Sequence, residues 1–301
     1  MRNSNLFLLV LLAMLWGPSF LFIKIAVAEI PPLTLVAIRL SLAAVFLYAI
    51  LKIAGRSLPR GWGEWKKFVF MGFFANSLPF VLFSFGEQFA DSGAASILNG
   101  TTPLFTVILA HSLIEDERLT ANRFAGVLIG FLGILLIFFP DLLRLINGQA
   151  LDSTGAVVGL LAFIAASVCY GIAIVYGRMR LRGLPPLVGP AAQLICAAVI
   201  VLPVSLLVDR PFDLAPSAPA ALSATALGIF GTAFAYLVYY RLVDQAGATF
   251  ISLVTYLLPP IGVILGVLIL DEEPGIYALA GMAAIIGGVM LVNRVERRRA
   301  A

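Results

Sequence analysis

Ten apolar segments of about 20 residues, joined by short connections, limit what this 301-residue chain can fold into. A helix of about 20 residues crosses the roughly 30 Å hydrocarbon core of a bilayer. The alternating segments of a membrane β-barrel are absent, and no connection is long enough to hold a soluble domain. We therefore expect an all-α integral membrane protein. Its predicted spans, numbered 1 to 10 in chain order, cover approximately residues 6–27, 34–53, 66–86, 93–113, 122–140, 154–177, 187–208, 217–241, 247–270 and 275–293.

The composition supports the same class. The chain is 61% hydrophobic and 12% charged, with a mean hydropathy of +1.04, far from the soluble globular range. The uncharged run 5–23 is longer than the core of a signal peptide, so we expect it to be retained as span 1. One histidine and two cysteines without ligand spacing indicate no metal site and no cofactor. The basic residues lie between apolar runs, which favours the lipid bilayer over a nucleic-acid partner.

The distribution of basic residues predicts the topology. Sixteen of the 20 Lys and Arg residues fall in loops or tails on one side of the predicted bundle. Cytoplasmic loops carry the excess of positive charge in membrane proteins. We therefore expect both termini, including a basic tail at 294–301, to be cytoplasmic.

The two halves of the chain repeat each other. On one helical face of span 4 lie five small or polar residues, and span 9 carries a matching set 156 positions later. Because each half has an odd number of spans, the halves must run in opposite directions through the membrane. The sequence thus predicts two inverted five-helix repeats, at 1–140 and 154–293, around a central cavity. The matched faces are Ser96, Asn99, Pro103, Thr106 and Ala110 in span 4, and Ser252, Thr255, Pro259, Gly262 and Gly266 in span 9.

Prolines at matching places predict the floor of a substrate site. Pro103 has no N–H, so the carbonyl of Asn99 loses its helical partner. Such a carbonyl is tolerated in a membrane only beside protein or a water-filled cavity, and it can accept from a substrate ammonium. The Asn and Thr side chains can bind the carboxylate of a substrate. The alternative to a substrate site is a pair of ordinary membrane helices with tolerated prolines. The predicted floor comprises Ser96, Asn99, Thr102, Pro103, Ser252, Thr255, Tyr256 and Pro259.

Aromatic side chains in the neighbouring spans are candidates for stacking on an apolar ligand, with core or lipid-facing packing as the alternative. They are Trp16, Phe80, Phe83, Tyr170, Tyr236, Tyr239 and Tyr240. Lys24 and Arg39 are the bases placed within spans. We expect them to reach the headgroups or to pair with Glu29, Glu87 or Asp91; a gate for an anionic group is the alternative. For His111, packing is favoured over a role as a proton relay.

The motifs resemble those of a known transporter class. Trp16-Gly17 and Tyr170-Gly171 are early aromatic-Gly pairs, and each half has a central proline in its fourth span followed by an acidic triplet. This pattern is similar to the EamA-type repeats of the drug/metabolite transporter superfamily, and most similar to bacterial YddG-type exporters of aromatic amino acids. The resemblance implies a central cavity enclosed by spans 1–4 and 6–9, peripheral spans 5 and 10, and a bacterial inner membrane as the location.

The expected function is export of a small amphiphilic metabolite, an aromatic or neutral amino acid, by alternating access. A multidrug or nucleobase exporter of the same fold is the alternative. A lipid-modifying membrane enzyme would need a nucleophile–base pair or a metal cluster, for which the sequence offers no candidate. No Asp or Glu lies at mid-depth in a span, which favours facilitated or potential-driven movement over proton coupling.

The acidic triplets and the small residues of spans 5 and 10 predict further helix contacts. The acidic triplets 115–117 and 271–273 precede spans 5 and 10 and are expected to cap those helices. Small residues four apart in spans 5 and 10 permit close helix contact, either within the monomer or between two monomers of a homodimer.

Overall fold

The computed structural model describes residues 2–114, 120–146, 154–181, 187–246 and 254–299. The first half contains α1 (Arg2–Trp16), α2 (Ser19–Val27), α3 (Pro32–Ile53), α4 (Trp62–Gly72), the π-helix η1 (Phe73–Ser77), α5 (Leu78–Gly86), α6 (Ser92–Asn99), α7 (Thr102–Leu113) and α8 (Ala121–Ile146). The second half contains α9 (Thr154–Arg180), α10 (Val188–Val208), the 3₁₀ turn η2 (Pro211–Asp213), α11 (Ala218–Gly228), the π-helix η3 (Ile229–Phe234), α12 (Ala235–Ala246), α14 (Val254–Leu270) and α15 (Ile276–Arg299).

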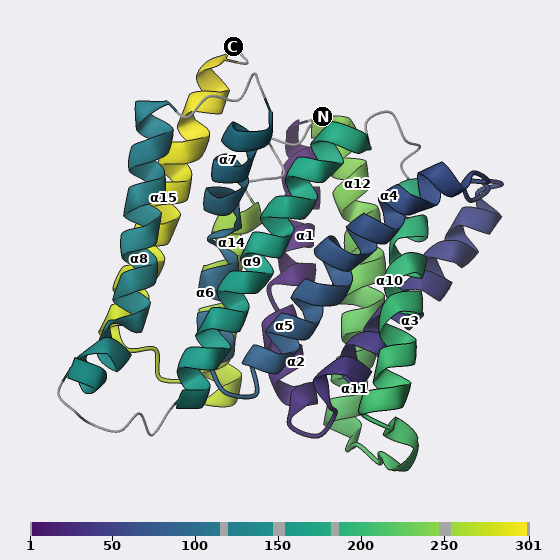
Figure 1. Ribbon diagram of the computed structural model, residues 1–301, viewed down its shortest axis with the longest axis horizontal. Coiled ribbons are helices and arrows are strands. Elements are labelled where there is room, and N and C mark those ends of the chain that lie inside the picture. The colour runs from purple at the N-terminus through teal and green to yellow at the C-terminus, as the bar shows by residue number, and fades with distance from the viewer. Residues whose placement is uncertain (1, 115–119, 147–153, 182–186, 247–253, 300–301) are drawn as a thin grey trace.

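The predicted fold is confirmed. Eight stretches of helix are long and apolar enough to cross a membrane, and the shorter apolar helices at 254–270 and 276–291 complete the ten spans among the described residues. The first and last helices reach the same end of the bundle (Figure 1). We call this the terminal end, and we call the opposite end, which carries loops 28–31, 87–91, 209–217 and 271–275, the distal end. That the terminal end faces the cytoplasm stays a prediction.

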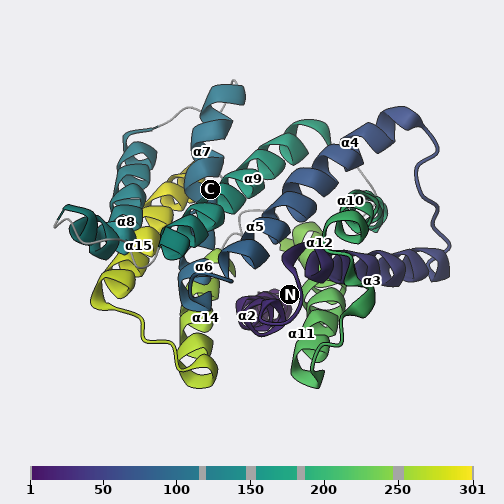
Figure 2. The same cartoon turned by 60° about the horizontal axis from the view of Figure 1, so that its bottom comes forward.

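Pairs of helices from the two halves hold the bundle together. Equivalent spans pack on each other: α3 on α10, α6 on α14, and α8 on α15. The contact of α5 with α9 (spans 3 and 6) has its counterpart in the contact of α11 with α2 (spans 8 and 1), which lie side by side in Figure 2. This exchange of equivalent contacts is what a two-fold relation in the membrane plane produces.

Helix irregularities also repeat. Spans 3 and 8 each contain a π-helix, beginning at Phe73 and Ile229, which are 156 positions apart. Span 4 is interrupted at residues 100–101, between α6 and α7, as its glycine and proline predict. Span 9 differs from the prediction, because α14 continues without a break through Pro259 and Pro260.

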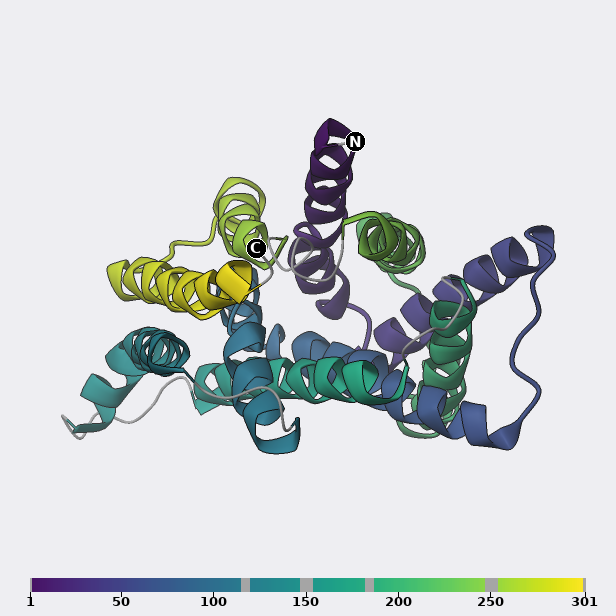
Figure 3. The same ribbon diagram turned by 90° about the horizontal axis from the view of Figure 1, so that it is seen from above.

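Spans 5 and 10 form one edge of the molecule, as the view from above shows (Figure 3). Their small residues allow backbone contact inside the monomer: a methyl group added to Gly288 would lie 2.5 Å from the Gly126 carbonyl oxygen, and one on Gly133 would lie 2.8 Å from the Gly281 oxygen. Gly287, by contrast, has open space beside it. The structure therefore gives these small residues an intramolecular role, and the homodimer stays a prediction.

A matched pair of substitutions tests this packing. We expect Gly288→Leu to force α8 and α15 apart and lower the free energy of unfolding by about 1–3 kcal/mol, the usual cost of overpacking. Gly287→Leu, one residue away on the open side, should leave the stability nearly unchanged. Thermal melting of the purified protein measures both, and equal melting temperatures for the two variants would contradict the intramolecular packing.

Candidate functional site

At the proline interruption of span 4, threonine hydroxyls donate hydrogen bonds to the backbone carbonyls of the preceding turn. The Thr102 hydroxyl donates to the Asn99 carbonyl at 2.8 Å, and the Thr101 hydroxyl donates to the Leu98 carbonyl at 2.6 Å. The carbonyl that Pro103 releases therefore already has a donor, contrary to the expectation that it is free for a substrate ammonium. Pro103 itself is half-buried near the start of α7. The Asn99 side chain is also half-buried, and its amide makes no hydrogen bond to the described residues.

The small face of span 4 packs directly against span 9. The Ser96 hydroxyl donates to the Gly93 carbonyl at 2.7 Å and reaches the Pro259 carbonyl at 3.4 Å. Gly262 lies so close to Ser96 that an added methyl group would overlap it, and one on Gly100 would lie 3.2 Å from the Pro259 ring. These positions form a helix–helix contact in this conformation.

The remaining span 9 candidates point in different directions. Thr255 is half-buried on α14, whereas the Tyr256 hydroxyl donates to the Val289 carbonyl on α15 at 3.0 Å. Tyr256 is thus directed toward the peripheral span 10. Ser252 lies outside the described residues. On α7, His111 is exposed.

Most of the aromatic candidates from the sequence lie in two groups of aromatic side chains. Phe83 has ring-centroid distances of 5.5 Å to Phe20, 5.6 Å to Phe163 and 6.1 Å to Tyr170, so spans 1, 3 and 6 meet there. In the second group, the Trp16 ring lies 5.7 Å from that of Tyr239. Tyr240 joins this group at 5.2 Å from Tyr239 and 6.2 Å from Tyr236. Phe20 and Phe163 were not among the predicted site residues.

Arg39 lies near Tyr170 of the first group and Tyr236 of the second, and it is 6% exposed. Its Nε donates to the Thr232 hydroxyl at 2.8 Å, and its guanidinium carbon lies 3.8 Å above the centre of the Phe80 ring. Its two terminal nitrogens make no hydrogen bond to the described part of the chain. A guanidinium stacked on an aromatic ring retains its planar donors for a carboxylate, so Arg39 has capacity for an anionic group.

The second repeat contains the same contact without the charge. Gln193 is the position 154 residues after Arg39, and its amide donates to Asn76 at 2.6 Å. Asn76 corresponds to Thr232 across the repeat and donates in turn to the Tyr236 hydroxyl at 2.7 Å. A polar link between spans 2 and 8 is thus mirrored between spans 7 and 3. Of these two links, the one between spans 2 and 8 contains a cation, Arg39, where the other contains the neutral Gln193. The link itself therefore does not require a charge.

Lys24 is bound to backbone. Its Nζ donates to the carbonyls of Glu87 and Ala90, both at 2.8 Å, at the end of α5. Glu29 accepts from the backbone N–H and the hydroxyl of Ser217, both at 2.6 Å, and the Ser217 hydroxyl bond lowers the pKa of Glu29. The predicted pairing of Lys24 with a carboxylate, or its extension toward headgroups, is therefore corrected to helix capping.

Glu87, considered from the sequence only as a partner for Lys24 or Arg39, has a burial that the sequence did not predict. Its side chain is fully buried, and neither carboxylate oxygen has a hydrogen-bond partner in the described structure. Burial raises the pKa of Glu87 well above its ordinary value. The residue follows the last apolar position of span 3 directly, where hydropathy predicts contact with water. Its burial depends on how loop 87–91 folds back, which hydropathy does not reveal.

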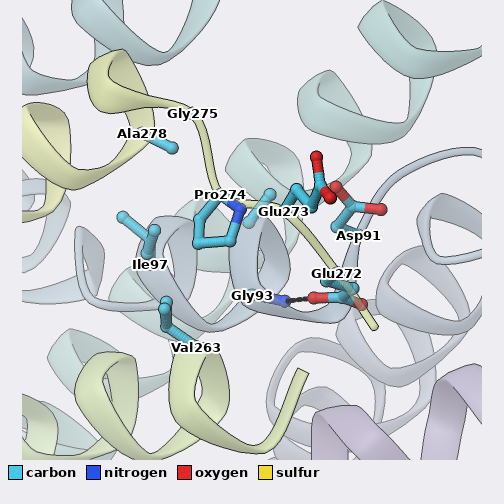
Figure 4. Close-up of a pocket in the computed structure, with 10 residues that line it drawn as sticks. Asp91, Gly93, Ile97, Val263, Glu272, Glu273, Pro274, Gly275 and Ala278 are labelled. Carbon is cyan, nitrogen blue, oxygen red and sulfur yellow. Dashed lines mark hydrogen bonds between the residues drawn. The ribbon is translucent and has the colours of Figure 1, made fainter. Parts of the chain in front are cut away.

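Glu272 closes the distal end of spans 4 and 9. Its two carboxylate oxygens accept from the backbone N–H groups of Ser92 at 2.7 Å and Gly93 at 2.9 Å. Figure 4 shows the bond from Gly93. Glu272 of the second acidic triplet thus caps α6 rather than α15, in contrast to the prediction, and the first triplet, 115–117, lies outside the described residues. Asp91 and Glu273 line a cavity of about 80 Å³ beside it. Burial raises the pKa of Asp91.

Other hydrogen bonds between the halves also lie at the distal end. Thr34 donates from its backbone and its hydroxyl to Asp209, both at 2.8 Å, next to the Glu29–Ser217 contact. Toward the terminal end, a cavity of about 360 Å³ opens between α3, α10 and α12. Its lining includes Leu47, Ile50, Pro190, Tyr236, Tyr240 and Arg241. In the described structure, the hydrogen bonds at the distal end thus hold the two halves together there.

The chain belongs to the EamA-like transporter family, which matches residues 3–139 and 157–294. The protein is accordingly a multi-pass membrane transporter of this family, not an enzyme. The two matched segments correspond to the two five-span halves seen in the structure.

Curated relatives align over almost the whole chain. One is "Uncharacterized transporter YoaV" of Bacillus subtilis, 26% identical over 95% of both chains. Another is "Probable terminal-alkyne amino-acid exporter" of Streptantibioticus cattleyicolor, 28% identical over 97% of this chain and 95% of the relative. A crystal structure with 21% identity superimposes with a TM-score of 0.68 over the full length of both chains, which shows the fold alone.

Removal of the Tyr236 hydroxyl tests the Asn76 link. Tyr236→Phe leaves the buried Asn76 amide without its acceptor, and we expect the free energy of unfolding to fall by about 1 kcal/mol. Tyr240→Phe is the matched control, because Tyr240 lines the same cavity and its hydroxyl makes no hydrogen bond to the described residues. Chemical or thermal unfolding of both variants measures the difference, and equal stabilities would refute the role of this link.

Proposed function

We propose that this transporter exports aromatic or other apolar amino acids by alternating access, with Arg39 as the anchor for the substrate carboxylate. The central observation is that Arg39 is almost fully buried yet has two nitrogens without partners in the described chain. Burial of an unneutralised cation is costly in a membrane. An anionic group bound there offsets that cost.

The aromatic residues near Arg39 suit the rest of such a substrate. The Phe83 group and the Trp16–Tyr239 pair present rings from spans 1, 3, 6 and 8. Aromatic side chains favour stacked or edge-on contacts with an aromatic ligand. The Asn99 amide at the break in span 4, which has no hydrogen-bond partner in the part of the chain that the structure describes, is the proposed partner for the polar end of the substrate, together with Thr255 of span 9.

The inverted repeats and the closed distal end support alternating access. Two oppositely oriented halves that rock against each other expose a central site first to one side and then to the other. In the described state, hydrogen bonds between the halves close the distal end, and the cavity between α3, α10 and α12 lies toward the terminal end. With the terminal end in the cytoplasm of a bacterial inner membrane, this state would load substrate for export.

The relatives are consistent with amino acids as cargo, since one of them is named as a probable amino-acid exporter. The resemblance to YddG-type exporters favours aromatic members of that class. The alternative, a multidrug or nucleobase exporter, rests on the same aromatic surface. A guanidinium anchor favours a carboxylate-bearing cargo over an organic cation.

Flux into liposomes containing the purified protein tests the proposal. We expect saturable flux of labelled phenylalanine or tryptophan, reduced in Asn99→Ala. Arg39→Gln should reduce phenylalanine flux at low concentration by about 10–100-fold, the loss of a charge-assisted hydrogen bond.

Phenethylamine, which lacks the carboxylate, separates substrate recognition from folding. Its flux should respond little to Arg39→Gln, because the missing group is the one that Arg39 binds. Absence of flux for every amino acid tested would favour the drug or nucleobase alternative. An equal loss for phenylalanine and phenethylamine would remove Arg39 as the anchor.

A further inference from the structure

Glu87 has a position unlike that of any other described acid in this protein. It follows the last residue of α5, its side chain is fully buried, and both carboxylate oxygens lack a hydrogen-bond partner among the described residues. An ionised carboxylate left in this state is strongly unfavourable, whereas a protonated one carries no net charge to desolvate. The geometry is therefore suited to the neutral acid.

Two cations, Lys24 and Arg39, favour the ionised form of Glu87, but the cost of its burial outweighs their effect. The Lys24 ammonium donates to the backbone carbonyls of Glu87 and Ala90, and the Arg39 Nε donates to Thr232. Neither forms an ion pair with the Glu87 carboxylate within 4.0 Å in the described structure.

The neighbouring acid Glu272 and the apolar packing partners of Glu87 favour its neutral form. Glu272 faces Glu87 across the distal end and opposes its ionisation, and Asp91 is the next acid along the loop. Helix α9 packs against the end of α5 through Gly159 and Phe163, neither of which titrates.

The repeat gives no structural reason for an acid at this position. Asn76 and Thr232 are equivalent positions 156 residues apart, and at the same offset Glu87 corresponds to Val243. The second half therefore carries an apolar residue at the equivalent sequence position. Helix capping at the end of α5 is performed by Lys24, so the Glu87 side chain is not needed for it.

Glu87 lies beside the contacts that close the distal end. The residues that follow its loop, Ser92 and Gly93, bind Glu272 of the second half. Lys24, on α2, donates to the Glu87 carbonyl. Glu29, which follows α2 in the chain, accepts from Ser217 of the second half. Separation of the two halves at this end would admit water to the Glu87 carboxylate.

We propose that Glu87 is a proton-binding site that is occupied when the distal end is closed and vacated when it opens. The proton is taken from water at the distal end and forms an O–H bond on the carboxylate; opening returns it to water there. The proposal rests on the alternating access proposed above and is independent of the cargo. It replaces the sequence-based expectation of movement without a protonatable carboxylate.

The sign of the pH dependence follows from linkage. The closed state has the higher affinity for the proton, because burial raises the pKa of Glu87 there. The preference for the closed state is fully present below the pKa of the hydrated, open state and is lost as the pH rises through the pKa of the closed state. Between these two values, the closed-to-open ratio should fall about tenfold per pH unit.

Infrared spectroscopy of the substrate-free, full-length protein in lipid nanodiscs detects the bound proton directly. We expect the carbonyl band of a protonated carboxyl group at neutral pH in the unsubstituted protein. The band should be missing in Glu87→Gln and retained in Asp91→Asn, the matched control on the same loop. A band that is absent from the unsubstituted protein, or that survives in Glu87→Gln, would overturn the proposal whatever the protein transports.

Distances between spin labels at Ala28→Cys and Leu214→Cys report on the distal end, one label in each half, in a background without Cys169 and Cys196. The short-distance population should decline as the pH rises in the unsubstituted protein and in Asp91→Asn. In Glu87→Gln it should be independent of pH and remain closed. An unchanged pH dependence in Glu87→Gln would contradict the assignment even if amino-acid flux is observed.

Discussion

Hydrocarbon supplies no hydrogen bonds, so every polar group within this bundle must find its partner in the protein itself. Most do: the Thr102 hydroxyl serves the carbonyl released by Pro103, and Gln193, Asn76 and Tyr236 form a continuous chain. Within the described residues, two charged side chains of the central spans and the distal loops, Arg39 and Glu87, have polar atoms without a hydrogen-bond partner. Since burial of an unpaired charge costs several kcal/mol, their retention is understandable as a requirement of function. The proposals for substrate carboxylate and proton both follow from this imbalance.

The architecture explains why these two residues stand out. Equivalent spans pair across the halves, and equivalent polar links join span 2 to span 8 and span 7 to span 3. Such a framework is nearly symmetric, which is what the proposed alternation between states closed at either end requires. Arg39 and Glu87 break the symmetry, because Gln193 and Val243 occupy the corresponding positions. Charge on one side of a symmetric framework gives the two ends different preferences for ligands.

The sequence was sufficient for much of this fold. Segment length and hydropathy predicted ten spans, and the offset of 156 residues between the proline faces predicted the repeat. Hydropathy does not specify the rotation of a helix about its axis or the course of a loop. For that reason it missed the burial of Glu87, and it assigned Glu272 to its neighbour in sequence, α15, whereas the loop folds back onto α6. The rotamer of Thr102 decides whether the Asn99 carbonyl is free, and local propensities do not fix that rotamer.

Alternating exposure of the centre of the bundle is tested most directly by the reactivity of a cysteine at Asn99 toward a membrane-impermeant thiol reagent. The Glu29–Ser217 contact offers a lock, because cysteines at these neighbouring positions can be joined across the distal end by a short, cleavable bifunctional thiol reagent. The account predicts that Asn99→Cys reacts from both sides of the membrane when the cross-link is cleaved, and only from the terminal side when it is intact. Equal reactivity from the distal side with the lock closed, or no reactivity from either side, would contradict it.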